Sequence, residues 1–339
     1  MKKSLIPLIL CGLFLLGCAE DTNKMLPKPD DQTERRKLAT QITYTSKVDI
    51  LFVVDDSGSM SSHQNNLSRN IDIFVNDIVK NRILDYQIGV ISSTGDNFQA
   101  DPCSNGYLCG TPRFVTRSTV DAINTLRRNL LVGTSGSGTE EFFDPVMMAI
   151  NSSGQGMYNQ GFYRQDAFLA VVFITDAEDQ SSISANDFYD QLVKLKNGDD
   201  KKVLLYGAYI PSSAGNTCAR DDISMPPRRL EQLFALAKST TYSLCDPAFG
   251  QGLAKISGEI SAKVGRFIYL DRPPDIRTIK VTYGTQVLAN DPKTGWIYDP
   301  ELNAIMLGEQ IQWIDQGPGI QVEVEFVEAE YPTPKPPRK

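Results

Sequence analysis

The sequence is almost without histidine, since His63 is the only one among 339 residues. A serine–histidine–aspartate triad would have to use His63, because the imidazole is the general base of such a site. We expect His63 instead to lie exposed near the start of the first helix. The sequence therefore gives little support to hydrolytic chemistry, and we expect that the protein is not an enzyme.

Basic residues are also too few for a nucleic-acid-binding protein. Lysine and arginine total 34 against 41 aspartates and glutamates, which gives a formal net charge of −7. Nucleic-acid binding is disfavoured, because a duplex demands a basic protein face. With 41% hydrophobic and 9% aromatic residues, the composition is that of a globular protein that is neither disordered nor polytopic in a membrane.

The longest apolar run, Leu5 to Leu16, follows two lysines at the amino terminus. It is too short to span a membrane as a helix and is typical of a secretory signal peptide. The letters LLGC at 15–18 resemble the lipobox of bacterial lipoproteins, which implies removal of residues 1–17 and lipidation of Cys18. The alternative is a plain signal peptide whose cysteine is incidental.

The lipobox resemblance implies a lipid-anchored protein of the bacterial cell envelope. Several acyl chains anchor stably, since each buried methylene contributes about 0.8 kcal/mol. Ala19, and not aspartate, follows the cysteine, which by the sorting rule of enteric bacteria favours the outer membrane. The sequence does not indicate whether the protein faces the periplasm or the cell surface.

Four of the six cysteines lie beyond the leader and the lipobox, in a chain expected to enter an oxidising compartment. Cys103 and Cys109 flank a loop-like stretch, and Cys218 and Cys245 share a second polar region. Among three possible pairings we therefore favour Cys103–Cys109 and Cys218–Cys245. The alternative, a metal site at these cysteines, has neither a histidine nor a CxxC spacing to support it.

Four apolar runs rich in β-branched residues each precede polar residues and then a helical periodicity: 48–54, 86–92, 167–175 and 202–210. Runs that are apolar on both faces belong to a central parallel sheet. The segments between them carry apolar stripes at helical spacing. The pattern predicts an α/β fold over residues 47–271, a doubly wound, mostly parallel sheet flanked by helices.

The remaining segments differ from this domain in composition. Residues 18–46 are polar and contain prolines, which predicts a flexible tether. After the break DRPPD, short alternating segments separated by turn signals predict a small C-terminal antiparallel β module at 272–329. The proline-rich residues 330–339 are expected to form an extended tail.

Polar side chains follow two of the four apolar runs. Asp55, Ser57 and Ser59 come directly after the first run, Asp176 follows the third, and Thr139 lies at a helix start behind a glycine-rich loop. Ligands of open α/β sheets bind beyond the carboxyl ends of the strands, where alternate residues of an extended turn point to one side. Oxygen-only donors suit a hard cation such as Mg²⁺. The sequence therefore predicts a magnesium site.

The order DxSxS, a later threonine and an aspartate in a TD dipeptide resembles the von Willebrand factor type A (VWA) domain and its metal-ion-dependent adhesion site (MIDAS). The resemblance implies that Ser57 and Ser59 coordinate the cation directly, and Thr139 at least in the ligand-competent state. It implies that Asp55 and Asp176 act mostly through bound water. Such sites commonly bind a carboxylate of a protein partner as the last ligand, and Mn²⁺ or Ca²⁺ could replace Mg²⁺.

Asp56 departs from the family pattern, in which glycine or asparagine is common at this position. An extra acid beside the cation would raise cation affinity or repel an acidic ligand. With Glu178 and Asp179 it would form an acidic rim or a solvated face. A simpler alternative for the pattern is that its serines and its threonine cap helices. Two cysteine-bearing segments, about 96–112 and 212–226, look inserted relative to a compact family domain.

Three functions follow from the sequence. The leading hypothesis is a lipid-anchored envelope protein that binds, through its cation, a protein partner offering an acidic residue. The second is a structural envelope component in which the cation only stabilises the fold. The third is a hydrolase that depends on His63, or on two carboxylates as in glycosidases, although Asp55 and Asp176 are already assigned to the cation. The sequence indicates neither the partner's identity nor the oligomeric state.

Overall fold

The computed structural model describes residues 39–44, 46–81, 83–94, 103–150, 159–213, 226–246, 249–317 and 320–329. The predicted leader, Cys18, Cys218, most of the tether and the proline-rich tail lie outside these ranges. Within them, no helix is both long and apolar enough to cross a membrane.

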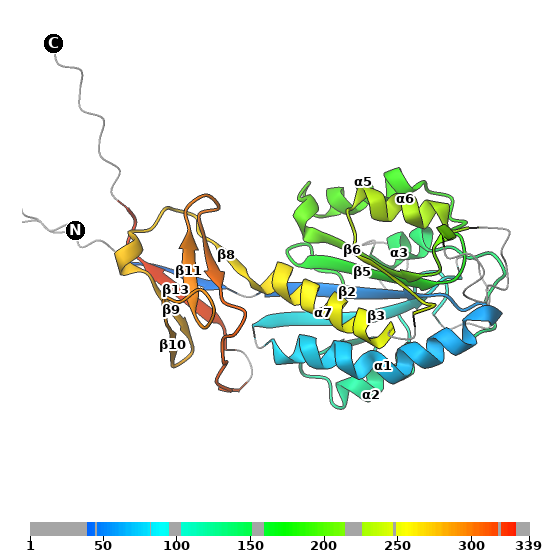
Figure 1. Ribbon diagram of the computed structural model, residues 1–339, viewed down its shortest axis with the longest axis horizontal. Helices are drawn as coiled ribbons and strands as arrows, with labels where there is room; N and C mark the ends of the chain where they lie inside the picture. The colour runs from blue at the N-terminus through cyan, green and yellow to red at the C-terminus, as the bar shows by residue number, and fades with distance from the viewer. Residues whose placement is uncertain are drawn as a thin grey trace, which may run out of the picture. The chain divides into compact units, whose positions relative to one another are not determined.

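A six-stranded sheet forms the centre of the α/β domain, in the order β4-β3-β2-β5-β6-β7 (Figure 1). Its strands are β2 (Ser46–Val54), β3 (Leu84–Ser92), β4 (Phe114–Thr116), β5 (Phe168–Thr175), β6 (Val203–Tyr209) and β7 (Thr241–Ser243). Only β4 is antiparallel to its neighbour, and the other pairings are parallel. The predicted fold class, a mostly parallel sheet flanked by helices, is confirmed.

Helices cover both faces of this sheet, and alternate residues of β2 divide between them. Ile50, Phe52 and Val54 belong to one buried cluster with the apolar stripes of α1 (Ser61–Lys80), α2 (Ala122–Asn129) and α7 (Phe249–Gly265). Leu51 and Val53 belong to a second, with α3 (Phe143–Ile150), α5 (Ala185–Leu195) and α6 (Arg228–Leu236). Because side chains alternate along a strand, an apolar strand of this kind must be covered on both sides.

A buried ion pair lies near the amino end of β2. The Asp49 side chain is fully buried, and Arg164 reaches it with its Nε at 2.8 Å and its backbone N–H at 2.6 Å. Arg164 also pairs with Asp85 at 2.7 Å. One guanidinium therefore ties β2 to β3 at the edge opposite the one where ligands of such sheets bind.

The C-terminal β module contains two antiparallel sheets. One has the order β1-β13-β9-β10, and the other β11-β12-β8. The strands are β1 (Thr40–Tyr44), β8 (Phe267–Tyr269), β9 (Lys280–Tyr283), β10 (Gln286–Leu288), β11 (Trp296–Asp299), β12 (Ala304–Leu307) and β13 (Val322–Phe326). A buried apolar cluster that includes Val281, Val324 and Phe326 joins them.

Two predicted boundaries differ from the structure. Residues 40–44, which we assigned to the tether, form strand β1 and pair with β13 from Thr40–Phe326 to Tyr44–Val322. Residues 267–269, which we assigned to the α/β domain, pair with β12 of the module. In each case, a short alternating segment gains its stability from a partner strand that is distant in the sequence.

A disulfide joins Cys103 and Cys109, as predicted. Its loop is bonded to the end of β3, where Cys109 N–H donates to Val90 O at 2.8 Å and Asn105 N–H donates to Thr94 O at 2.8 Å. The described part of the inserted segment at 96–112 thus lies at the carboxyl edge of the sheet. Cys245 is also disulfide-bonded, and its predicted partner is outside the described ranges.

Candidate metal centre

Asp55 lies at the point where β2 ends and is fixed between β2 and β5. Its backbone N–H donates to Ile174 O at 2.9 Å, and its side chain is fully buried. One carboxylate oxygen accepts from Ser57 N–H at 2.8 Å and the other from the Thr175 hydroxyl. These bonds hold the carboxylate in place, and the TD dipeptide supplies one of them.

The two serines of the DxSxS pattern join Asp55 to Asp176. Ser57 Oγ and Ser59 Oγ are 3.0 Å apart, and Ser59 Oγ donates to Asp176 Oδ1 at 3.0 Å. Neither hydroxyl caps a helix, since the short 3₁₀ turn at Gly58–Met60 has no side-chain cap and Met60 precedes α1. Four of the five predicted ligands are therefore brought together.

Thr139, the fifth predicted ligand, is not brought to this cluster. It is exposed, and its N–H donates to Ser137 Oγ at 3.1 Å. None of the hydrogen bonds among the described residues joins its hydroxyl to the other four. It does not cap α3 either, because Asp179 and Ser181 accept the first N–H groups there.

Asp56 is buried beneath the glycine-rich loop, whose Gly136 N–H donates to Asp56 O. It accepts from Ser93 Oγ at 2.8 Å and from Thr94 Oγ1 at 2.9 and 3.0 Å. The expected acidic rim or solvated face is wrong for Asp56 and also for Asp179, since both are 1% exposed. The reason is that each carboxylate has buried donors to bind.

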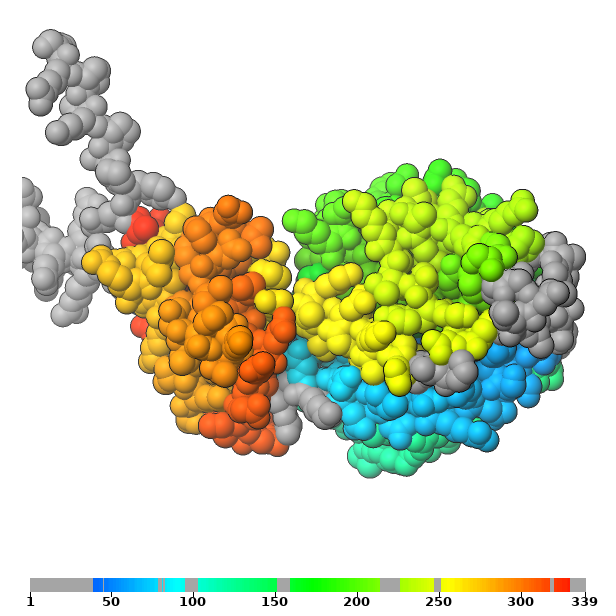
Figure 2. Space-filling view, in the orientation of Figure 1, coloured from blue at the N-terminus to red at the C-terminus, as the bar shows by residue number. Residues whose placement is uncertain are grey.

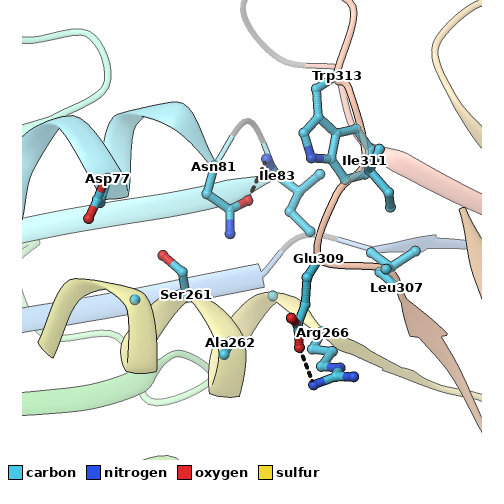
Figure 3. Close-up of a pocket in the computed structure, with 13 residues that line it drawn as sticks. Asp77, Asn81, Ile83, Ser261, Ala262, Arg266, Leu307, Glu309, Ile311 and Trp313 are labelled. Carbon is cyan, nitrogen blue, oxygen red and sulfur yellow. Dashed lines mark hydrogen bonds and ion pairs between the residues drawn. The ribbon is translucent and has the colours of Figure 1, made fainter. Parts of the chain in front are cut away.

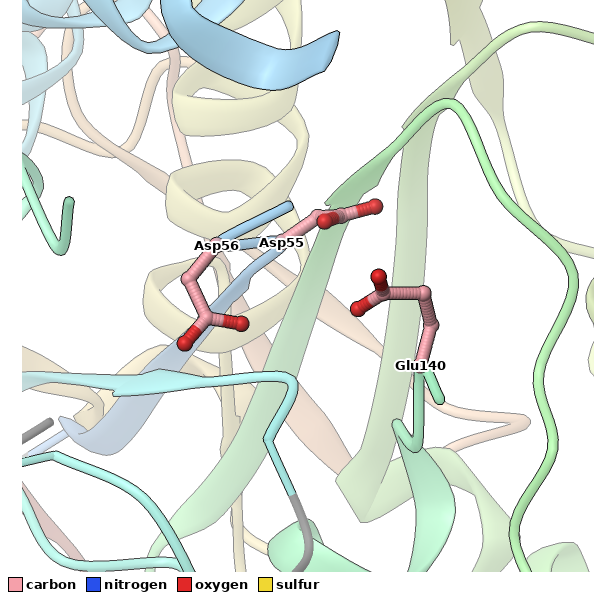
Figure 4. Close-up of side chains that lie close together, drawn as sticks. All are labelled: Asp55, Asp56 and Glu140. Atoms are coloured by element: carbon pink, nitrogen blue, oxygen red, sulfur yellow. The ribbon is translucent and has the colours of Figure 1, made fainter. Parts of the chain in front are cut away.

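Glu140 is the acid that the sequence did not indicate as a ligand. It is 4% exposed, and its carboxylate lies with those of Asp55 and Asp56, with one oxygen from each of the three within 4.8 Å of the others. Figure 4 shows the Glu140 carboxylate pointing toward the two aspartates at the end of β2. Among the described residues, no other group of three acids, cysteines or histidines is close enough to share an ion.

Burial dominates the electrostatics of this cluster. Desolvation raises the pKa of Asp55 to about 6, against the hydrogen bonds from Thr175 and Ser57. Desolvation and then the neighbouring Asp55 raise the pKa of Glu140 to about 8. No ion pair among the described residues involves Asp55 or Glu140. Ionising both carboxyl groups is therefore unfavourable unless a cation lies beside them.

A divalent cation fits this donor set. The converging side chains offer carboxylate and hydroxyl oxygens, with no sulfur or imidazole bonded among them, and hard cations prefer such ligands. A positive ion would also offset the unfavourable burial of clustered carboxylates. The residues that could hold it are Asp55, Ser57, Ser59, Asp176 and Glu140.

No protein-family model matches the chain, and no curated protein matches it. Several solved structures are similar to it. A von Willebrand factor type A protein from Catenulispora acidiphila has 13% identity and a TM-score of 0.37, covering 86% of this chain and 60% of that one. The pilus adhesin SpaC from Lactobacillus rhamnosus GG has 11% identity and a TM-score of 0.40, covering 85% and 40%.

A third similar structure is proximal thread matrix protein 1 from the mussel byssus with a zinc-occupied MIDAS motif. Its identity is 13% and its TM-score 0.36, with coverage of 65% of this chain and 48% of that one. This chain thus spans 40 to 60% of the length of these three structures. The family that the sequence resembles is among its structural neighbours, and likenesses of this size concern the fold alone.

Gly136 allows the glycine-rich loop to lie directly on Asp56. Its N–H donates to Asp56 O at 2.9 Å, and a Cβ at this position would lie 2.3 Å from Asp56 Cγ. We expect Gly136→Ala to lower the free energy of unfolding by about 1–3 kcal/mol, because neither the buried carboxylate nor the loop can yield freely. Urea denaturation measures this change.

Gly138→Ala is the matched control, since a Cβ there meets nothing within 4 Å. Its effect on the unfolding free energy should be within about 0.5 kcal/mol, as for most surface substitutions. Equal effects of the two substitutions would show that the contact between the loop and Asp56 is not tight.

A cavity of about 550 Å³ lies elsewhere in the structure, between the ends of α1 and α7 and the β module (Figure 3). Its lining includes Asp77, Ser261 and Leu307. Asp77 lies about 24 Å along α1 from Ser61, at 1.5 Å per residue. The cavity is therefore separate from the acidic cluster.

Proposed function

We propose that the protein binds a protein partner in the bacterial envelope through a divalent cation at the carboxyl edge of its central sheet. The observation that supports this most is the convergence of Asp55, Ser57, Ser59 and Asp176 beside buried acids. We propose Mg²⁺ as the cation, an acidic side chain as the partner's contribution, and Cys18 as the lipid anchor to the outer membrane.

Asp55 and Gln64 would have different roles at this site. Asp55 is held rigidly by Thr175 and by the Ser57 N–H, so it can orient the hydroxyls of the DxSxS turn. Gln64 donates to Asp55 O at 2.7 Å and to Gly133 O at 2.6 Å, which fastens the glycine-rich loop to the end of β2. The cation, when bound, would supply an electrophilic position for a partner's oxygen ligand.

A catalytic role has less support. His63 is half-buried in the first turn of α1. Burial lowers its pKa, and the opposing effect of Asp176 is smaller. No hydrogen bond among the described residues links His63 to a serine. A nucleophile would need such a bond to be activated.

The second candidate function is a structural one, in which the cation only stabilises the fold. The burial of Asp55, Asp56 and Glu140 favours it, because an ion among three buried acids is partly enclosed. This candidate predicts that chelation lowers the melting temperature but leaves every partner interaction intact.

A crosslinking pull-down from detergent-solubilised native membranes separates the two. With the full chain as bait, we expect a partner to be captured in Mg²⁺ and lost when EDTA is added. Ser57→Ala should abolish capture, because it removes a hydroxyl of the cluster. Ser118→Ala, an exposed serine beyond β4, should leave it unchanged.

Capture that is the same with EDTA, and the same in Ser57→Ala, would overturn the proposal. If capture survives while chelation still lowers the melting temperature, the structural candidate holds.

A further inference from the structure

The geometry points to Glu140 as a cation ligand of this chain, in the place that the sequence pattern gives to Thr139. This inference rests on the proposed function, since it concerns the same cation. It changes the chemistry of the site, because a carboxylate replaces a neutral hydroxyl.

Backbone bonds on both sides fix Glu140 at the carboxyl edge of the sheet. It forms a bridge with Thr94 just beyond β3, and its carbonyl oxygen accepts from Gln180 N–H at 2.7 Å. The next residue, Glu141, donates its N–H to Ser93 O at 2.9 Å. These contacts direct the Glu140 side chain into the cluster, whereas Thr139 stays exposed just outside it.

The side chain of Glu140 is buried, and one of its two carboxylate oxygens is available to bind a ligand. Its Oε2 is 2.8 Å from Ser93 Oγ, which is also 2.8 Å from Asp56 Oδ1. A serine has one hydroxyl hydrogen, so it can serve only one of these two carboxylates at a time. The structure gives Glu140 Oε1 no hydrogen bond among the described residues. Oε1 is therefore the oxygen with which Glu140 can bind a cation, while Ser93 holds the other oxygen in the buried cluster.

A carboxylate ligand would alter what the site does. Cation affinity rises with the number of charged ligands. A cation held by Asp55, Asp176 and Glu140 is also more fully neutralised than one held mainly by hydroxyls. The site should therefore keep its cation without a partner, and attract a partner's carboxylate less strongly than a site of neutral ligands would.

Titration of the full chain with Mn²⁺, followed by electron paramagnetic resonance of the free ion, tests the assignment. Glu140→Gln should weaken Mn²⁺ binding about 10-fold or more, a loss typical of changes around a metal site. Thr139→Val should cause a clearly smaller loss. Glu309→Gln provides the matched control, since Glu309 is an exposed acid paired with Arg266. It should bind Mn²⁺ as the wild type does.

The melting temperature of the metal-free protein is the second readout. Glu140→Gln keeps the shape of the side chain but cannot ionise among the buried acids, so metal-free Glu140→Gln should melt at or above the wild-type temperature. A purely structural role for Glu140 would lower it. Glu140→Asp, which keeps the charge but shortens the reach, should also weaken Mn²⁺ binding and serves if Glu140→Gln folds poorly.

The outcomes distinguish the two proposals. A wild-type protein that binds no Mn²⁺ overturns the proposed function and this inference with it. If the wild type binds Mn²⁺ and Glu140→Gln binds it equally well, only the assignment to Glu140 is overturned. A loss in Thr139→Val as large as that in Glu140→Gln would also overturn it.

Discussion

Replacing Arg164 with alanine should lower the free energy of unfolding by about 3–5 kcal/mol. The substitution leaves the Asp49 carboxylate fully buried without its main counter-charge, and removing one partner of a buried ion pair costs this much. The Asp85 carboxylate, 45% exposed, would lose its partner but stay hydrated. Urea denaturation at neutral pH measures the loss.

An exposed ion pair and a change of pH serve as controls for the contribution of the buried Arg164–Asp49 pair. Arg127→Ala breaks a more exposed pair with Asp72, at 3.5 Å, and should cost no more than about 1 kcal/mol. Burial raises the pKa of Asp49 from 3.8 to about 6. The stability that protonated Asp49 contributes is thus complete below about pH 4 and is lost as the pH rises through about 6. The cost of Arg164→Ala should therefore be smaller at pH 5 than at pH 7.5, and a cost independent of pH would contradict this account.

Asp55→Asn should abolish the stabilisation that a divalent cation gives the protein. A cation at 100 times its dissociation constant adds about 2.7 kcal/mol to the free energy of unfolding of a protein that binds it only when folded. The Asp55 carboxylate is fully buried and accepts the Ser57 N–H, which fixes the DxSxS turn. The substitution therefore removes a charged cation ligand and loosens the turn that carries the two serines. Urea denaturation of the full chain with Mg²⁺ and with EDTA measures the gain.

Asp166→Asn is the matched control, because Asp166 is exposed and pairs with Lys47 near the start of β2. Mg²⁺ should raise the free energy of unfolding of Asp166→Asn as much as it raises that of the wild type. A gain that persists in Asp55→Asn would place the cation elsewhere in the chain. Comparing each variant with itself, with and without cation, removes any change that the substitution makes to the metal-free fold.

The parts of the site that could be predicted from the sequence are those set by local spacing. Asp55, Ser57 and Ser59 follow a strand that is apolar on both faces, and such a strand can only be central. Asp176 follows the neighbouring strand of the sheet, so parallel pairing brings it to the same edge. No long-range information was needed beyond the rule that ligands gather at the carboxyl ends of such strands.

The parts that could not be predicted depend on contacts between distant segments. Glu140 enters the cluster through a bridge to Thr94, and the sequence offered only its position next to Thr139 as a signal. Asp56 looked like a surface acid because its donors, Ser93 and Thr94, lie at the end of another strand. Strand β1 was missed since its partner, β13, comes about 280 residues later in the chain.

The direct succession of β1 and β2 has a mechanical consequence. Strand β1 ends at Tyr44 and β2 begins at Ser46, so a pull between the segment before Ala39 and a ligand at Asp55 would run along these two strands. Nine residues of β2 span about 30 Å at about 3.3 Å each. The strands β9 to β13 lie outside this path, and tension would pass to β2, which β3 and β5 clamp from both sides. Strand β1 belongs to the β module, so its five pairs with β13 would bear the same tension on the module's side.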